Sequence, residues 1–219
     1  EVGGGGDTVA RKIVPGLGAN LGQPVIIENR GGEATIPIVT VAKAAPDGYT
    51  LLVSGGALWL LPLLQEVSYD PVKDIAPITL GLVQPLLMVV HPSVAANSVK
   101  EFIALAKAKP GALNYSSGIG GSGPHLGGEL FKALAGVDIV RIPYKGGTPA
   151  LQGLIAGQTQ VMFATTTQAV PQVKSGKLRA LGVTTAQPST LFPDLPTVAS
   201  QGVPGFELTA SNGVFAPGR

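Results

Sequence analysis

Three stretches of this chain place glycines and small hydroxyl residues directly before a segment with helical character. They are Gly3–Asp7, Ser116–His125 and Tyr144–Thr148. The first turn of a helix leaves about four backbone N–H groups without partners and carries about half a unit of positive charge. Glycines let an anion approach those groups closely. The pattern therefore indicates a protein that holds an anionic small molecule largely through its backbone.

The stretch Gly118–Gly123 also matches the glycine pattern of dinucleotide-binding turns, G-x-G-x-x-G. That interpretation is weakened because Pro124 follows directly and because Asp138 precedes the next strand, whereas the pattern needs an acidic residue at the end of that strand. We favour an anion pocket in which Ser117, Ser122 and backbone N–H groups donate hydrogen bonds. A flexible glycine turn without a ligand is the plainer alternative.

His125 lies in the first turn of its expected helix, where the helix dipole disfavours a positive charge, so we expect a neutral imidazole that hydrogen-bonds its loop or a ligand. The chain has one other histidine, His91, and no acidic cluster near either, so we expect no metal site. No G-x-S-x-G turn is present, and no aspartate is placed to orient a base. We therefore predict neither a cofactor nor catalytic residues. An α/β enzyme that uses Ser122 with His125 is the rival interpretation.

Three further residues have two interpretations each. Asp7 either satisfies N–H groups at the start of its helix or contacts a ligand through water. Lys145 either supplies charge opposite a carboxylate or is simply solvated. Trp59 either packs in the core, which we favour, or forms part of a cleft wall.

Composition excludes several classes of function. The 219 residues contain no cysteine, which rules out disulfides, thiolate metal sites and a cysteine nucleophile. Charged residues make up 13%, the net charge is +2, and lysines and arginines are scattered singly, so we expect no nucleic-acid partner. The longest apolar runs, Ala57–Leu64 and Leu86–Val90, are far shorter than the roughly 20 residues that a membrane-spanning helix needs.

Strand-like and helix-like segments alternate, which predicts an α/β fold with mainly parallel strands and ligands at the carboxyl ends of those strands. The expected strands are Val25–Glu28, Tyr49–Ser54, Leu86–Val90, Leu113–Ser116, Ile139–Pro143, Val161–Ala164 and Leu178–Thr184. The expected helices are Thr8–Leu21, Ile36–Ala44, Val99–Ala108, Pro124–Leu134, Pro149–Ala156 and Thr167–Ser175.

Taken together, these segments resemble the extracytoplasmic solute receptors of the tripartite tricarboxylate transporter family, also called Bug-type receptors. The resemblance runs from Gly3 to about Pro217 and is carried by GGGGDTVAR, LGQPVIIENR, AKAAPDGYTLL, SVKEFIALAKAKPGALNYSSGIGGSGPHLGGELF, RIPYKGGTPALQGLIAGQTQVMF and SGKLRALGVTTAQPSTLFPDLPTVASQGVPGFE. It implies a two-lobe type II periplasmic-binding-protein fold with a ligand cleft between the lobes. Lobe one is expected from residues 1–84 and 185–219, and lobe two from 85–184.

The resemblance also implies a function. The protein is expected to be a periplasmic receptor and not an enzyme, with its signal peptide removed or outside the sequence. It would act as a monomer that captures a small mono- or dicarboxylate for the permease subunits of the transporter. The lobes would flex near Val83–Pro85 and Thr184–Thr185. The ligand-binding residues carried over by position are Gly4, Gly5, Gly6, Asp7, Ser54, Gly55, Gly56, Ala57, Ser117, Gly118, Gly121, Ser122, His125, Lys145, Gly146 and Thr165.

Departures from the family pattern make their own predictions. Gly6 stands where a hydroxyl residue is usual, Gly31–Thr35 is altered and one residue shorter, Ala164 replaces a common aspartate, and Leu58–Leu61 replaces a polar stretch. These changes indicate a solute with a more apolar body than citrate, such as a longer aliphatic or an aromatic carboxylate. The family's first strand and C-terminal helices are not in the sequence, so lobe one is expected to be truncated at both ends. A truncated remnant that no longer binds a solute is the second rival.

Overall fold

A computed structural model of the chain describes residues 4–30 and 33–218. The predictions that concern Gly3 and the first part of Gly31–Thr35 lie outside these residues. The chain divides into two compact units. Unit 1 contains residues 1–83 and 211–219, and unit 2 contains residues 84–210.

Among the described residues of unit 1, three strands form its sheet. β1 (Leu52–Gly55) pairs antiparallel with β7 (Thr209–Pro217), and Gly55 lies opposite Asn212. β7 lies next to β2 (Ile75–Val90), and both of these strands contain residues of both units. The sequence had predicted neither β7 nor the first eleven residues of β2, because both carry glycines and prolines that interrupt the alternation of a strand.

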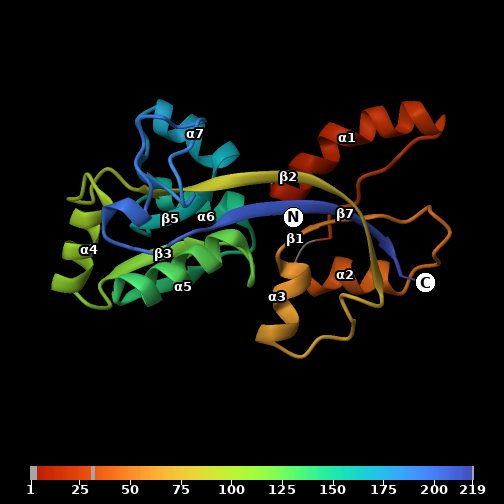
Figure 1. The fold of residues 1–219 in the computed structure, drawn as a ribbon, viewed down its shortest axis with the longest axis horizontal. Helices are drawn as coiled ribbons and strands as arrows, with labels where there is room; N and C mark the ends of the chain where they lie inside the picture. The colour runs from red at the N-terminus through yellow and green to blue at the C-terminus, as the bar shows by residue number, and fades with distance from the viewer. Residues whose placement is uncertain (1–3, 31–32, 219) are drawn as a thin grey trace. The chain divides into compact units, whose positions relative to one another are not determined.

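In the part of unit 1 that the structure describes, three helices pack around the sheet. α1 (Gly5–Leu21) lies on one side of the strands, while α2 (Thr35–Ala42) and α3 (Ala57–Leu64) lie on the other (Figure 1). As the sequence predicted, α1 ends at Gly22, whose φ of 65° is left-handed and whose N–H bonds the Gly18 carbonyl. The residues of one buried cluster come from α2, α3 and the strands: Ile38, Val41, Leu52, Leu58, Leu61, Tyr69, Ile75 and Phe215.

The strand predicted at Val25–Glu28 is wrong. Residues 24–30 have no regular structure, and the Ile26 side chain is 87% exposed. An apolar run forms a strand only where a neighbouring strand accepts its backbone hydrogen bonds. Within the described residues, none of the strands pairs with this segment.

Unit 2 contains a mixed sheet in the order β4, β3, β5, β2, with β6 (Arg179–Val183) also paired with β2. β3 (Leu113–Ser117) runs parallel to β4 (Ile139–Pro143) and to β5 (Val161–Thr165), as expected. β2 runs antiparallel to β5 and β6. The predicted α/β class is therefore confirmed, and the sheet is mixed rather than mainly parallel.

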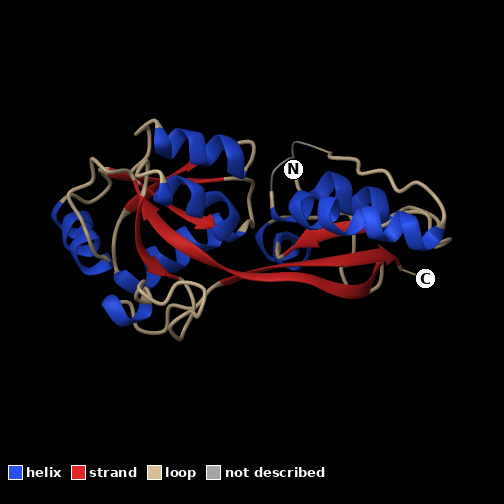
Figure 2. Cartoon of the chain, turned by 90° about the horizontal axis from the view of Figure 1, so that it is seen from above, coloured by secondary structure: helices blue, strands red, loops and turns tan. Residues whose placement is uncertain are grey.

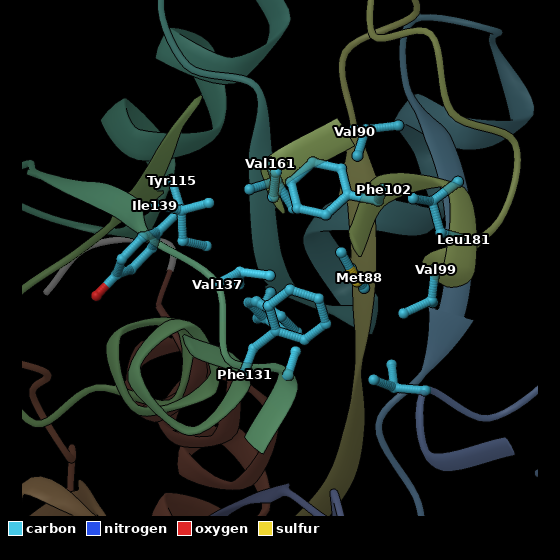
Figure 3. Close-up of a cluster of buried hydrophobic side chains, with 14 of the residues drawn as sticks. Met88, Val90, Val99, Phe102, Tyr115, Phe131, Val137, Ile139, Val161 and Leu181 are labelled. Atoms are coloured by element: carbon cyan, nitrogen blue, oxygen red, sulfur yellow. The ribbon is translucent and has the colours of Figure 1, made fainter. Parts of the chain in front are cut away.

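Helices cover both faces of the unit 2 sheet (Figure 2). α4 (Val99–Ala108) and α5 (Gly123–Ala135) contribute to one core, which also contains Met88 and Val90 of β2 (Figure 3). α6 (Gly147–Ile155) and α7 (Thr166–Lys174) contribute to the second core, which contains Leu87 and Val89. Successive residues of β2 therefore enter opposite cores, which explains why Leu86–Val90 is apolar at every position.

Residues 185–210 belong to unit 2, whereas the sequence had assigned them to lobe one. The chain folds back after β6, because the Val198 N–H donates to the Val183 carbonyl at 2.9 Å and the Leu208 N–H donates to that of Thr184 at 2.8 Å. Val203 and Phe206 are buried in the α4–α5 core. The boundary in β2 falls between Val83 and Gln84, one residue before the expected position.

Within the described ranges, none of the helices is long and apolar enough to cross a membrane.

Trp59 is 42% exposed and its ring makes an edge contact with Phe215 at 6.0 Å between centroids. Its packing role is therefore partial.

Candidate functional site

The first glycine turn begins α1 in unit 1. Gly4 is the N-cap residue, in an extended conformation, and the helix starts at Gly5, three residues before the expected start. Asp7 faces inward: its side chain is 3% exposed, accepts from Arg11 Nε at 3.0 Å, and accepts from Asn29 Nδ2 at 2.8 Å. Asp7 thus fixes the segment around Asn29 to the start of α1. These two partners are side chains, whereas the sequence analysis expected backbone N–H groups or a water-mediated ligand.

A second glycine turn lies at the end of β1. Ser54 and Gly55 are its last residues, and the Gly56 carbonyl accepts the Leu60 N–H at 3.0 Å in the first turn of α3, which begins at Ala57. Turns at the starts of two helices are therefore present in unit 1.

Asn212 of β7 lies between these two turns and was missed by the sequence analysis. A Cβ on Gly5 would lie 2.8 Å from Asn212 Nδ2, and a Cβ on Gly55 would lie 3.2 Å from Asn212 Oδ1. A larger residue at Gly5 would displace the Asn212 amide, and one at Gly55 would also collide with the Ser211 carbonyl oxygen, 2.8 Å from the Cβ position. The signal in the sequence is a polar Asn-Gly pair within an otherwise small and apolar run, residues 209–217.

The long glycine turn of unit 2 connects β3 to α5. Ser117 ends the strand, Gly118 is buried, and Gly121 has a left-handed φ of 73°. Ser122 is the N-cap residue of α5, but its hydroxyl accepts no bond from the helix. Its Oγ is buried and has no hydrogen-bond partner in the described part of the chain. Ser122 thus has a free hydrogen-bonding group at the positive end of a helix.

His125 braces this turn. The Gly121 N–H donates to His125 Nδ1 at 3.1 Å, so the neutral ring carries its proton on Nε2. Burial, together with the positive charge of Arg141, holds the pKa of His125 below its ordinary value. The expectation of a neutral imidazole that hydrogen-bonds its own loop agrees with this geometry. Nε2–H remains available as a donor.

Arg141 is the second residue that the sequence analysis missed. It projects from β4, donates through Nε to Ser117 Oγ at 2.8 Å, and donates through a terminal nitrogen to the Gly118 carbonyl at 3.1 Å. The guanidinium therefore orients the glycine turn and places a positive charge behind it. An arginine in the middle of a short apolar strand is the signal that could have found it.

The turn at Lys145–Gly146 lies against the turn at Gly118. A Cβ on Gly118 would lie 3.1 Å from the Gly146 carbonyl carbon, and the Tyr144 N–H donates to the Ser117 carbonyl at 2.9 Å. Parallel pairing of β3 with β4 brings these two turns to the same edge of the sheet. Gly146 is buried, whereas Lys145 is exposed.

Thr165 ends β5 and is the N-cap residue of α7. Its hydroxyl donates to Gln168 Oε1 at 3.0 Å and contacts the Thr167 hydroxyl at 3.2 Å. Because β5 is parallel to β3, Thr165 lies at the same edge of the sheet as Ser117. The predicted residues of unit 2 thus gather at the carboxyl ends of three parallel strands. In unit 1, Gly5, Gly6 and Gly55 lie beside Asn212.

Comparison with known proteins agrees with this arrangement. A family model for the tripartite tricarboxylate transporter family receptor matches residues 9–219. Protein BugT of Bordetella pertussis is 36% identical over 219 residues, which cover 98% of this chain and 67% of that protein. The chain spans about two thirds of the length of such relatives: 67% of BugT, and 65% of the UPF0065 protein in the tcbD-tcbE intergenic region of Pseudomonas sp. strain P51.

Solved structures match closely as well. R. palustris Rpa4515 with adipate has a TM-score of 0.92 at 34% identity, covering 99% of this chain and 74% of that one. MatC from Rhodopseudomonas palustris with bound malate has a TM-score of 0.90 at 34% identity, covering 99% and 75%. The periplasmic binding protein BugD has a TM-score of 0.92 at 33% identity, covering 100% and 74%.

The mixed α/β sheet and these matches define a solute-binding receptor of the periplasmic type. The chain belongs to the tripartite tricarboxylate transporter receptor family. The family resemblance inferred from the sequence motifs is therefore confirmed, and with it the prediction of a receptor rather than an enzyme.

Proposed function

We propose that this protein captures a small carboxylate in the periplasm and delivers it to the permease subunits of a tripartite tricarboxylate transporter. The observation that carries the proposal is the set of donors at the start of α5. Backbone N–H groups, the buried Ser122 hydroxyl and His125 Nε2–H gather there, with the Arg141 charge behind them. Similar structures described with bound adipate and malate support a carboxylate as the ligand.

The energetics allow useful affinity from few contacts. Hydrogen bonds to a charged group contribute roughly 1.5–3 kcal/mol each. Three or four of them, with some apolar contact, approach the about 8 kcal/mol that corresponds to micromolar binding. The Ser122 hydroxyl favours binding of a carboxylate, because a bound carboxylate would supply the hydrogen-bond partner that this buried group lacks.

Capture would follow the two-lobe mechanism of binding proteins. We expect units 1 and 2 to act as the two lobes and to close on the solute, with the glycine turns of both contributing. The chain passes between the units at Val83–Gln84 and Ala210–Ser211, which are the candidate hinge positions. The remaining predicted residues, from Gly4 to Ala57 in unit 1, and Lys145, Gly146 and Thr165 in unit 2, would line the closed site.

The apolar substitutions around α3 support a solute with a long aliphatic or aromatic body. Leu58 and Leu61 are buried in the unit 1 core, whereas Trp59 is partly exposed beside Phe215. Trp59 is therefore the most exposed residue of this group.

Thermal denaturation and calorimetry against a panel of adipate, malate, citrate, hexanoate and benzoate test the proposal. At least one carboxylate is expected to raise the melting temperature and bind with micromolar affinity. The Ser122→Ala variant should weaken that binding, and Lys109→Ala, at the exposed end of α4, should not. A flat response to the whole panel would refute carboxylate capture by this chain and support the remnant interpretation.

A further inference from the structure

Gln84 is a buried side chain whose carboxamide is only half satisfied. The residue is 5% exposed, and its Oε1 accepts from the Thr166 hydroxyl at 2.7 Å. Its Nε2 is buried and has no partner in the part of the chain that the structure describes. Folded proteins leave few buried polar groups unpaired, because each unmade bond is costly. The Gln84 amide therefore calls for a functional explanation.

The amide lies at the start of a helix. Thr166, which holds it, is the first residue of α7, a helix of nine residues. The N-cap residue Thr165 makes no capping bond to this helix, because its hydroxyl donates to Gln168 instead. Unpaired N–H groups and the positive end of the dipole thus accompany Gln84. The unpaired amide of Gln84 and the N-terminus of α7 together suit an anionic group or another strong hydrogen-bond acceptor.

Gln84 also lies near the donors of α5. Leu86 follows it by two residues on β2, pairs with Thr165, and has its Cδ2 3.4 Å from the position of a Cβ on Gly123, the first residue of α5. Residues two apart on a strand share a face. The side chain of Gln84 is therefore on the face of β2 that meets α5.

The pairing of the strands also places Gln84 beyond the carboxyl end of β3. Leu86 pairs with Thr165 and Tyr115 pairs with Val161, so Gln84 lies about four residues farther along the sheet than Ser117. With β5 between β2 and β3, the two backbones are about 10 Å apart across the strands and roughly 13 Å apart along them. A second acceptor group that reaches Gln84 from the start of α5 therefore belongs to an extended, flexible ligand.

We propose that Gln84, held by Thr166, is a specificity-determining residue that donates to the second carboxylate of a dicarboxylate. The first carboxylate is held at the start of α5, so this inference rests on the proposed function. A monocarboxylate of equal length leaves the Gln84 amide unpaired and binds more weakly. The site thereby selects dicarboxylates over monocarboxylates.

Calorimetry with a matched ligand pair, adipate and hexanoate, tests the inference. The wild type is expected to prefer adipate. Gln84→Leu keeps a similar volume but lacks the amide, and should weaken adipate binding roughly 10- to 100-fold. Its effect on hexanoate should be less than about threefold, since no bond to that ligand is lost. Gln187→Leu, an exposed glutamine of the same unit, is the matched control and should change neither.

A second variant keeps the test decisive if Gln84→Leu does not fold. Gln84→Glu places a negative charge opposite the second carboxylate, so the preference should change from adipate to 6-aminohexanoate, which carries an ammonium there. Two results would overturn the role of Gln84 and leave the proposed function standing. One is a wild type that prefers 6-aminohexanoate over adipate. The other is a Gln84→Leu variant that weakens the binding of adipate and hexanoate equally, or weakens neither. A wild type that binds no carboxylate would instead refute the proposed function, and the inference with it.

Discussion

Gly118 provides the sharpest test of why the unit 2 turns need glycine. A Cβ at this buried position would lie 3.1 Å from both the carbonyl carbon of Gly146 and the backbone nitrogen of Gly147. These neighbours are backbone atoms of the adjacent turn, so they move only if the whole turn shifts. Gly118 is not in the left-handed region, so Gly118→Ala introduces a steric cost without backbone strain. Gly120, in the same loop, has nothing within 4 Å of its Cβ position and is the matched control.

The magnitude follows from two opposing terms. An added methyl in a packed position costs about 1–3 kcal/mol. Replacing glycine with alanine also restricts the unfolded chain, which stabilises the fold by about 0.4–1 kcal/mol. Gly118→Ala should therefore be destabilised by about 1–2 kcal/mol, which lowers the melting temperature by roughly 2–8 °C for a chain of this size. Gly120→Ala has only the second term and should be as stable as the wild type or slightly more stable.

Calorimetric melting and solute titration of both variants provide the measurement. Because separating the Gly118 and Gly146 turns displaces the amides proposed to hold a carboxylate, Gly118→Ala should also weaken binding, by about 10-fold for each 1.4 kcal/mol lost. Gly120→Ala should bind as the wild type does. If the two variants match in both stability and affinity, the close packing of the turns has no role and the reasoning is refuted.

Three further predictions concern unit 2. Arg141→Met removes two charge-assisted hydrogen bonds to the glycine turn and should reduce carboxylate affinity at least about 10-fold, whereas Arg141→Lys should lose less affinity. If titrations give the wild type and both variants equal affinities, the orienting role of Arg141 is contradicted. The depressed pKa of His125 means that the unfolded chain binds its proton more readily, so its contribution to stability is present above about pH 6.5 and lost as the pH falls toward the folded-state pKa. Melting curves from pH 7.5 to 5 should show this loss in the wild type and less of it in His125→Gln; identical slopes would argue against it. Phe131→Ala opens a cavity among the rings of Phe102, Phe163 and Phe206, and should cost about 3–5 kcal/mol in denaturant unfolding; a cost under about 1 kcal/mol would contradict this packing.

Local patterns predicted much of unit 2. The helices at Val99–Ala108 and Pro124–Leu134 lie within a residue or two of α4 and α5. Ser98 caps α4 as expected, since its hydroxyl accepts from the Glu101 N–H at 3.1 Å. Apolar periodicity and capping residues act over three or four positions, so they are visible in a short stretch of sequence.

Strand pairing was predicted less well. The segment Val25–Glu28 has the composition of a strand but is unpaired, whereas the glycine-containing β7 is a strand because β1 and β2 lie beside it. A strand is stabilised by its neighbours, which are distant in sequence. Residues 185–210 were expected in lobe one but lie in unit 2, because their partners, such as Val183 and Thr184, are set by the folded chain.

The family, the α/β class and the glycine turns could be predicted from the sequence, because each of these depends on residue types within a few positions of one another. The side chains that support those turns are identified only in the folded chain. Asn212 and Arg141 reach the turns from other strands, and Gln84 reaches the start of α7. Arg141 and Ser117 are 24 positions apart in the chain, and Gln84 and Thr166 are 82 positions apart. Such contacts arise from sheet pairing, and no local pattern in the chain specifies them.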